Sequence, residues 1–339
     1  MKAVCITAPG RVTLTDIAPP LPGPGEVALD VAFVGYCGSD LASFRGLNPL
    51  VGYPRVPGHE VAARVAGTGA GVDDLAPGDV VTVLPYFECG TCRACRLGRP
   101  NACVANQTMG VQREGAMTGR VVVPRAKVVP TPGLALRDAA LVEPCAVGFH
   151  AVRRGGVARG ERVVVLGCGM IGLGALMGSL RAGAEVIAVD LSPRKLDVAR
   201  ALGAAHAVAA GEGAAERIAA LTDGGPDVVI EAVGAPATFV QAVDLVAPCG
   251  RVVYIGYSKE PVAYDTKRFI TKEIDIRGAR NALPQDFADV LAWLGAHPAA
   301  GDLIVTATVP LDAAPGALRD WDRAPGEFTK ILVALDGAG

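Results

Sequence analysis

The sequence predicts a mixed α/β protein of two domains, a β-rich lobe followed by a doubly wound parallel sheet. The chain has 339 residues, more than one ordinary hydrophobic core accommodates. Residues 1–150 contain short apolar runs broken by turn residues, whereas strands alternate with helices from about residue 160 onward. We expect the segment 286–339 to return to the first lobe. The first domain is therefore predicted as 1–150 with 286–339, and the second as 151–285.

The strands of the first lobe are predicted from short, valine-rich apolar runs between turns. These runs are Val27–Val34, Val61–Ala66, Asp79–Leu84, Gly119–Val123 and Lys127–Val129. In the returning segment the pattern predicts a helix, a strand, a helix and a last strand, near Asp286–Ala296, Ile304–Thr308, Asp312–Trp321 and Thr329–Leu335.

The second domain alternates buried strands with helical stretches. The predicted strands are Arg162–Leu166, Glu185–Val189, Ala205–Ala209, Asp227–Glu231, Arg251–Ile255 and Ile274–Arg277. The first two helices are predicted at Ile171–Ala182 and Pro193–Leu202. This order predicts a doubly wound parallel sheet.

Composition indicates a globular protein and argues against nucleic acid as a partner. Hydrophobic residues make up 51% of the chain, and the formal net charge is -2. The N-terminus, MKAVCITAPG, lacks the apolar core of a secretory signal, and no apolar stretch reaches the roughly 18 residues of a membrane helix. Nine cysteines in such a chain favour a reducing cytoplasm and thiolate–metal sites over disulfides.

Four cysteines lie close together in the sequence, at Cys89, Cys92, Cys95 and Cys103. Thiolates at two-residue spacings can surround a tetrahedral zinc ion. Because all four come from one segment, residues 85–105, the set leaves no coordination position open for substrate. It therefore predicts a structural zinc. The alternative is a set of ordinary buried thiols.

A glycine-rich turn predicts a dinucleotide site. Gly167, Gly169 and Gly172 form a GxGxxG pattern between a predicted strand and a predicted helix. The first glycine permits the tight turn, the second lets the pyrophosphate approach the backbone, and the third allows close packing of helix and strand. The helix N-terminus then offers N–H groups to the phosphates.

Asp190 ends the next predicted strand and is placed to bind the ribose hydroxyls of the adenosine. A carboxylate at that position repels a 2′-phosphate, which favours NAD over NADP. Arg194 and Lys195 follow closely and either weaken this preference or lie on a solvated helical turn. The other predicted cofactor contacts are Met170, Ile171, Lys195, Val233, Ile255 and Arg280.

A second metal site is predicted from a mixed set of ligand types. Cys37 and His59 lie about twenty residues apart, Glu60 follows His59, and Glu143 adds a further carboxylate. Cysteine, histidine and carboxylate with a water form an open coordination set suited to Lewis-acid chemistry. Asp40 is placed to accept the other ring N–H of His59. Each residue taken alone is more ordinary, a core histidine or a loop carboxylate.

Gly58-His59-Glu60, the four-cysteine segment, Glu143-Pro144 and the Gly167 pattern together resemble the zinc-dependent medium-chain dehydrogenase family, over essentially the whole chain. The resemblance implies a GroES-like catalytic domain, a Rossmann domain that binds NAD, and a homodimer or homotetramer. It implies a catalytic zinc on Cys37 and His59, with either Glu60 or Glu143 completing the shell. Glu-Pro at 143–144 is typical of the polyol and sugar-acid branch.

Further motifs resemble bacterial L-galactonate oxidoreductases and their starvation-sensing relatives. They are Asn48-Pro49, Tyr53-Pro54-Arg55-Val56, Pro85-Tyr86, the run Lys272–Gly278, Arg280-Asn281-Ala282 and Asp286-Phe287. This resemblance implies a sugar-acid substrate. The segments Gly110-Val111-Gln112 and Arg113-Glu114-Gly115-Ala116 depart from the pattern, so the particular sugar acid stays open.

The resemblance implies oxidation of a secondary alcohol, in which zinc lowers the pKa of the substrate hydroxyl and the hydride passes to the nicotinamide. Ser39 is placed to relay the proton toward the cofactor ribose and water, the alternative being a hydroxyl bonded to the backbone. Many relatives have a histidine where this chain has Ala42, so the proton is expected to leave through water. The candidates to bind a substrate carboxylate or hydroxyls, unless they make surface ion pairs or cofactor contacts, are Arg113, Lys259, Arg280 and Asn281.

Two other functions remain open at this point. One keeps the chemistry and changes the substrate, to a neutral polyol such as galactitol or sorbitol, or to a ketone reduced in biosynthesis. The other is a non-catalytic regulatory protein that responds to NAD or zinc. The intact ligand set and Ser39 favour an enzyme.

Overall fold

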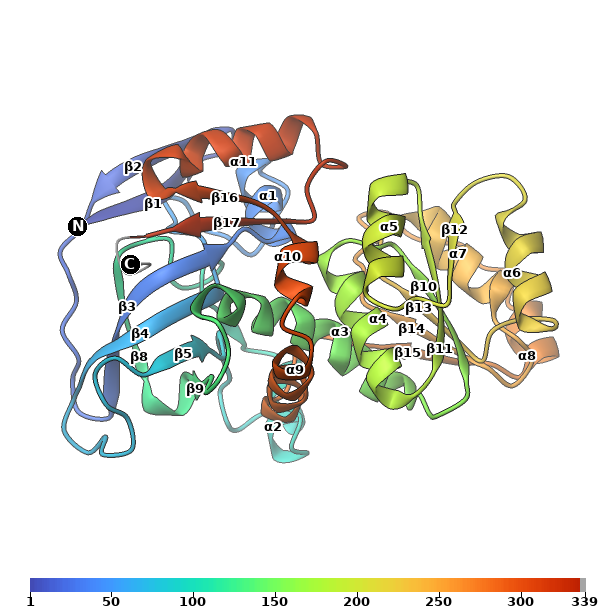
Figure 1. The fold of residues 1–339 in the computed structure, drawn as a ribbon, viewed down its shortest axis with the longest axis horizontal. Helices are drawn as coiled ribbons and strands as arrows, with labels where there is room; N and C mark the ends of the chain where they lie inside the picture. Colours follow the sequence, from blue (N-terminus) through green and yellow to red (C-terminus); the bar gives the residue numbers. More distant parts are fainter. Residues whose placement is uncertain (336–339) are drawn as a thin grey trace. The chain divides into compact units, whose positions relative to one another are not determined.

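The computed structural model describes residues 1–335, which divide into two compact units (Figure 1). Within the described residues, unit 1 comprises Met1–Glu143 and 294–335, and unit 2 comprises Pro144–Trp293. The boundaries predicted at 150 and 286 lie inside two helices, α3 (Val142–Gly155) and α9 (Pro284–Ala296). Asp286 of α9 accepts hydrogen bonds from α3, which holds the two helices together in unit 2. No helix in residues 1–335 combines the length and apolarity of a membrane span.

A seven-stranded sheet forms the centre of unit 1, in the order β16-β17-β3-β4-β5-β9, with β8 also paired to β3. The strands are β3 (Glu26–Gly35), β4 (Glu60–Thr68), β5 (Val80–Val83), β8 (Arg120–Pro124), β9 (Val128–Pro130), β16 (Val305–Pro310) and β17 (Lys330–Ala334). They confirm the predicted strands to within about two residues at each end. Figure 1 shows β17, in red, beside β3, in blue.

Pairing of β3 with β4 places the candidate metal ligands. The two strands are antiparallel, and Gly35 at the end of β3 lies opposite Glu60 at the start of β4. Cys37 therefore follows one strand, and His59 precedes the other, at the same end of the sheet. Apolar side chains of both strands are buried in the core of unit 1, and the register shifts at two irregularities along the pair.

The rest of unit 1 consists of short elements, several of which the sequence did not predict. The N-terminal hairpin pairs β1 (Lys2–Ala8) with β2 (Arg11–Asp16). A small ribbon pairs β6 (Tyr86–Phe87) with β7 (Gln107–Thr108). The helices are α1 (Gly38–Phe44), α2 (Arg93–Arg96), α10 (Ala300–Ile304) and α11 (Ala314–Arg323), with 3-10 turns at Pro100–Ala102, Arg125–Lys127, Leu136–Leu141 and Leu311–Ala313.

Unit 2 holds a six-stranded parallel sheet in the order β12-β11-β10-β13-β14-β15. Its strands are β10 (Arg162–Leu166), β11 (Glu185–Asp190), β12 (His206–Ala209), β13 (Val228–Glu231), β14 (Arg251–Tyr254) and β15 (Asp275–Gly278). The other helices of unit 2 are α4 (Met170–Ala182), α5 (Pro193–Ala201), α6 (Ala214–Thr222), α7 (Pro236–Leu245) and α8 (Lys267–Lys272). This is the doubly wound order, and it confirms the predicted fold class.

Strand order reverses beside β10, since β11 follows on one side and β13 on the other. In an open parallel sheet, ligands bind outside the carboxyl ends of the strands at such a switch point. Leu166 ends β10 and pairs in register with Val189 of β11 and Glu231 of β13. The glycine turn that starts at Gly167 therefore lies at the ligand-binding end of the sheet.

Candidate metal centres and cofactor site

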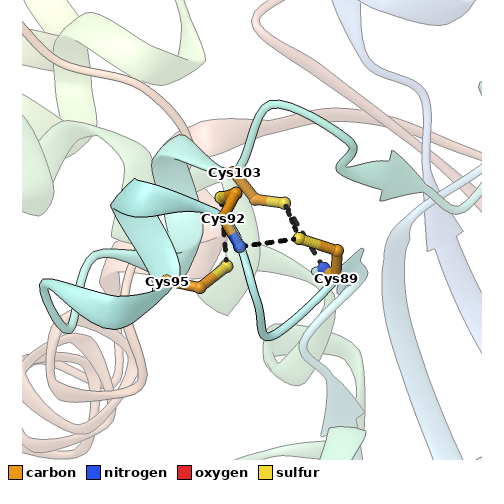
Figure 2. A group of neighbouring side chains, drawn as sticks. All are labelled: Cys89, Cys92, Cys95 and Cys103. Atoms are coloured by element: carbon orange, nitrogen blue, oxygen red, sulfur yellow. Dashed lines mark hydrogen bonds between the residues drawn. The ribbon is translucent and has the colours of Figure 1, made fainter.

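The four cysteines of the first motif converge in one short segment (Figure 2). Their sulfur atoms all lie within 4.8 Å of one another. The Sγ atoms of Cys92 and Cys95 are 3.5 Å apart, as are those of Cys89 and Cys103, which is too far for a disulfide. Tetrahedral ligation at the usual zinc–sulfur distance puts sulfurs about 3.8 Å apart. The donor set therefore fits one zinc ion with no protein ligand from elsewhere.

Backbone N–H groups point at these sulfurs, as they do around thiolates. Cys89 N–H donates to Cys103 Sγ, and Cys92 N–H donates to Cys89 Sγ, both at 3.3 Å. Hydrogen bonds from Thr91 and Cys92 lower the pKa of Cys89 to about 6, whereas burial raises the pKa of Cys95 to about 12. Hydrogen bonding thus favours the thiolate form of Cys89, whereas burial disfavours the thiolate form of Cys95.

The second group brings together Cys37, His59 and Glu60, whose ligand atoms also lie within 4.8 Å of one another. His59 and Glu60 are buried at 5% and 1% exposure. The Nδ1 atom of His59 is buried and has no hydrogen-bond partner within residues 1–335. Burial lowers the pKa of His59, but the charges of Cys37, Glu143 and Asp40 raise it well above its ordinary value. The negative charges around His59 therefore favour a positive charge within this group.

The sequence suggested that Asp40 accepts the ring N–H of His59, but in the structure it does not. Its carboxylate instead accepts the backbone N–H of Cys37 at 2.9 Å and that of Gly58 at 3.3 Å. Asp40 is 1% exposed, and burial raises its pKa while the nearby His59 lowers it. The carboxylate therefore links the segments that carry Cys37 and His59, and it acts on the imidazole by charge rather than by a hydrogen bond.

Glu60 is held by a lysine that sequence reasoning missed. Lys330, the first residue of β17, donates from Nζ to Glu60 Oε2 at 2.5 Å and to the Tyr36 carbonyl at 2.9 Å. Both charged side chains are almost fully buried. Burial raises the pKa of Glu60 to about 7, although the ammonium opposes this shift. The sequence did contain one signal for this ion pair. Lys330 begins a strand of buried apolar residues, and a charge buried there needs a partner of opposite charge.

Space for the Glu60 carboxylate depends on Gly35. A Cβ atom at residue 35 would lie 1.9 Å from Glu60 Oε2. Gly58, which precedes His59, has φ +98° and would place a Cβ 2.7 Å from Val34 Cγ1. Both glycines are therefore fixed by contacts around the metal group.

Glu143 lies near this group without joining it. It is 3% exposed, at the start of α3, and its Oε1 atom accepts a hydrogen bond from the Tyr86 hydroxyl. Burial first, and then the charge of Glu143, raises the pKa of Tyr86 well above its ordinary value. The sequence had named Tyr86 only as part of a motif. The structure gives it a specific partner.

Ser39 lies in the first turn of α1, two residues after Cys37. Its Oγ atom is buried and has no hydrogen-bond partner in the described part of the chain. The alternative of a hydroxyl bonded to the backbone is therefore wrong for Ser39. The hydroxyl is available to a ligand.

The three glycines of the fingerprint occupy different environments in unit 2. Gly167 has φ +92°, a conformation that side chains rarely adopt. A Cβ at Gly172 would lie 1.8 Å from the Gly167 carbonyl oxygen, whereas a Cβ at Gly169 would meet nothing within 4 Å. The turn is tight, the helix start packs closely on it, and the space beside Gly169 is open to a phosphate.

Asp190 ends β11 and organises this turn. One carboxylate oxygen accepts the Cys168 N–H at 2.7 Å, and the other accepts the Ser192 N–H at 2.8 Å. Each oxygen keeps a lone pair for a ribose hydroxyl. Lys195 lies in the first turns of α5 and is half-buried.

The remaining predicted cofactor residues lie near the carboxyl ends of the strands. Met170 and Ile171 begin α4, which follows β10. Val233 follows β13 and is 52% exposed, Ile255 follows β14, and Arg280 follows β15. These positions suit cofactor contacts, and each individual contact stays a prediction.

Comparison with known proteins identifies the family. The model of the alcohol dehydrogenase GroES-like domain matches residues 23–133, and the model of the zinc-binding dehydrogenase domain matches residues 171–296. L-galactonate-5-dehydrogenase of Escherichia coli K12 is 36% identical over 293 residues, which cover 86% of both chains. The chain belongs to the zinc-type medium-chain alcohol dehydrogenase family.

Two further relatives place this dehydrogenase among enzymes of CH–OH groups. Sorbitol dehydrogenase of Halalkalibacterium halodurans is 31% identical over 347 residues, 98% of this chain and 99% of that one. The crystal structure of the alcohol dehydrogenase rspB of Escherichia coli CFT073, complexed with NADH, superposes with a TM-score of 0.91 at 29% identity, over 98% and 99% of the two chains. The protein is an NAD-dependent zinc dehydrogenase of the polyol and sugar-acid group.

Proposed function

We propose that this dehydrogenase oxidises a secondary alcohol of a sugar acid, of the L-galactonate or L-gulonate type, and reduces NAD. The observation that carries the proposal is the group of Cys37, His59 and Glu60, in which His59 and Glu60 are buried and the His59 Nδ1 atom has no hydrogen-bond partner within residues 1–335. The similarity to L-galactonate-5-dehydrogenase supports a sugar-acid substrate. The mixed donor set supports a catalytic rather than a structural zinc, because it leaves a position for substrate.

Each residue of unit 1 takes a distinct role in the proposal. Cys37 and His59 hold the zinc, together with Glu60 or Glu143. When bound, the zinc supplies Lewis-acid polarisation of the substrate hydroxyl, and NAD accepts the hydride. Ser39 Oγ, which has no other partner in residues 1–335, accepts the hydroxyl proton and passes it to water.

In unit 2 we assign the dinucleotide to the glycine turn. The N-terminus of α4 receives the pyrophosphate beside Gly169, where a side chain would meet nothing within 4 Å. Asp190 receives the adenosine ribose, and its negative charge disfavours a 2′-phosphate. NAD is therefore the proposed cofactor in preference to NADP.

A positive side chain is needed to select a substrate carboxylate. Arg113 of unit 1 is exposed, and its guanidinium lies 4.1 Å from the centre of the Phe87 ring. Stacking of this kind fixes the guanidinium plane and leaves its N–H groups for a carboxylate. Lys259, Arg280 and Asn281 of unit 2 remain the other candidates.

The test is NAD reduction at 340 nm with a panel of L-galactonate, L-gulonate, L-idonate, D-gluconate, galactitol, sorbitol and a simple secondary alcohol. We expect strong turnover of one aldonate with NAD, and much weaker turnover with NADP. Turnover of the simple alcohol and not of any aldonate would contradict the sugar-acid proposal. Replacing Arg113 by Gln should raise KM for the aldonate selectively if Arg113 binds its carboxylate.

A neutral polyol is the second candidate substrate, and the similarity to sorbitol dehydrogenase favours it. In the same panel, turnover of galactitol or sorbitol alone would support this candidate. The zinc and NAD chemistry would then stay, and the carboxylate site would be discarded.

A homodimer or homotetramer and a cytoplasmic location stay predictions.

A further inference from the structure

Two buried glutamates belong to or neighbour the metal group of unit 1, and each accepts a hydrogen bond from a different donor. Glu60 bonds to the Lys330 ammonium, and Glu143 bonds to the Tyr86 hydroxyl. Glu60 lies with Cys37 and His59 inside the cluster of ligand atoms, whereas Glu143 is not part of that cluster. The two donors therefore bear on which glutamate ligates the zinc.

Tyr86 is rigidly built into unit 1. It is 4% exposed and lies in β6, where it pairs with Thr108 of β7. The preceding carbonyl, that of Pro85, accepts the Met109 N–H at 3.0 Å. The hydroxyl therefore has little freedom to follow Glu143 if the carboxylate moves toward the metal.

The bond itself restrains Glu143. A carboxylate buried at 3% exposure needs donors or a cation, because solvent is excluded. The phenol supplies a charge-assisted hydrogen bond, which is stronger than a neutral one. With that donor present, Glu143 is satisfied without the metal. Without it, Glu143 would need another donor or a cation.

We propose that Tyr86 is a positioning residue that holds Glu143 beside the catalytic metal, so that Cys37, His59 and Glu60 are the resting protein ligands and the fourth position stays open to substrate. The inference rests on the proposed catalytic zinc site. It makes Tyr86 a determinant of how readily an oxygen or nitrogen ligand enters that site.

The experiment uses the full-length protein loaded with Co²⁺ and titrated with imidazole. A site with four cysteine ligands has no open position, so the imidazole-induced difference spectrum in the visible range reports only the mixed site. In Tyr86→Phe, Glu143 should occupy the open position. Half-maximal spectral change should then require about tenfold to a hundredfold more imidazole, the factor for one hydrogen bond to a charged group.

Two further variants make the result specific. Tyr53→Phe removes another phenol, one that donates to the Ser43 carbonyl, and should leave the imidazole response unchanged. Glu143→Gln removes the competing ligand charge, so adding Tyr86→Phe to it should have no further effect on imidazole binding. Glu143→Gln also keeps the test informative if Tyr86→Phe folds poorly, because it should tighten imidazole binding or leave it unchanged.

Three results would overturn the proposal. One is an unchanged imidazole response in folded Tyr86→Phe. A second is loss of Co²⁺ from that variant, because Tyr86 would then support metal binding instead of restraining a competitor. A third is weaker imidazole binding in Glu143→Gln. None of these readouts needs a sugar acid, so silence across the substrate panel with a normal imidazole titration would count against the proposed function alone.

Discussion

The metal group of unit 1 and the glycine turn of unit 2 are assembled in opposite ways. Cys37, His59 and Lys330 come from segments up to about 290 residues apart, and buried charged side chains, Glu60 and Lys330, pair at this group. The turn from Gly167 to Asp190 lies within one strand–helix–strand segment and presents mainly backbone N–H groups. The comparison teaches that the first site depends on balanced charge, whereas the second depends on local backbone shape.

The largest expected effect separates the two sites completely. Cys37→Ala removes a ligand of the mixed group and should lower kcat at least about a thousandfold, because the Lewis acid is worth several kcal/mol. NADH binding, measured by fluorescence, should stay within about twofold, since the glycine turn is built from unit 2 alone. Cys5→Ala, which removes a thiol of unit 1 that lies in neither metal group, is the matched control. Retained turnover in Cys37→Ala would refute the zinc assignment.

The next effect tests whether unit 1 depends on balanced charge. Lys330→Met leaves Glu60 buried without its ammonium partner and should cost about 3–5 kcal/mol in the free energy of unfolding. Lys127→Met removes a more exposed ion pair, with Glu88, and should cost about 1 kcal/mol or less. Denaturant midpoints measure both. Equal shifts in the two variants would show that the buried pair has no special weight.

A smaller effect is expected at the acidic end of the cofactor turn. Asp190→Ser keeps a hydrogen-bond acceptor and removes the charge that disfavours a 2′-phosphate. The ratio of kcat/KM for NADP over NAD should rise about tenfold to a hundredfold. Asp197→Ser, on the exposed face of α5, should leave the ratio unchanged. An unchanged ratio in Asp190→Ser would remove Asp190 from cofactor selection.

The smallest effect concerns pH and compares the two metal groups of unit 1. A carboxyl with a raised pKa keeps its proton at higher pH, and a protonated carboxyl does not bind zinc. Because burial raises the pKa of Glu60 to about 7, and neighbouring charges raise the pKa of His59, zinc affinity of the mixed group should fall at least about tenfold per pH unit below pH 7. The four-cysteine group has no carboxylate ligand, so the titration of Glu60 does not weaken its zinc, and we expect it to release zinc at lower pH.

A chromogenic chelator reports the release of zinc from both sites in one sample. The assay is run at a series of pH values from pH 8 to pH 5. We expect two steps, the first from the mixed group. Cys37→Ala should remove the first step and leave the second. A single step, or release from the cysteine cluster first, would contradict the assignment of Glu60.

Most of unit 2 was predictable from the sequence because its information is local. Buried parallel strands are continuous apolar runs, and β10 was predicted at the bounds that the structure gives it. The glycine spacing located the turn for the same reason. In unit 1 the strands were predicted nearly as well, but the hairpin of β1 and β2 was missed. Helix α3 was also missed, although Pro144 in its first turn was a helix-start signal.

The charge partners of the metal group were not predictable in the same way. Nothing near Lys330 in the sequence indicates that it meets Glu60, because their contact arises from the pairing of β17 with β3 and of β3 with β4. Tyr86 stood out only through its motif. Asp40 was assigned to the wrong partner, since a short loop offers a carboxylate both backbone and side-chain donors. Residues that balance charge over long sequence distances need a structure.

Strand β17 also orders events during synthesis. The chain grows from its N-terminus, so Cys37, His59 and Glu60 emerge from the ribosome long before Lys330. Cys89 to Cys103 span a short stretch, whereas Glu60 meets its ammonium only after Lys330 of β17 has been synthesised. The four-cysteine group can therefore be complete, and able to bind zinc, at an earlier stage of synthesis than the mixed group with its charge partner.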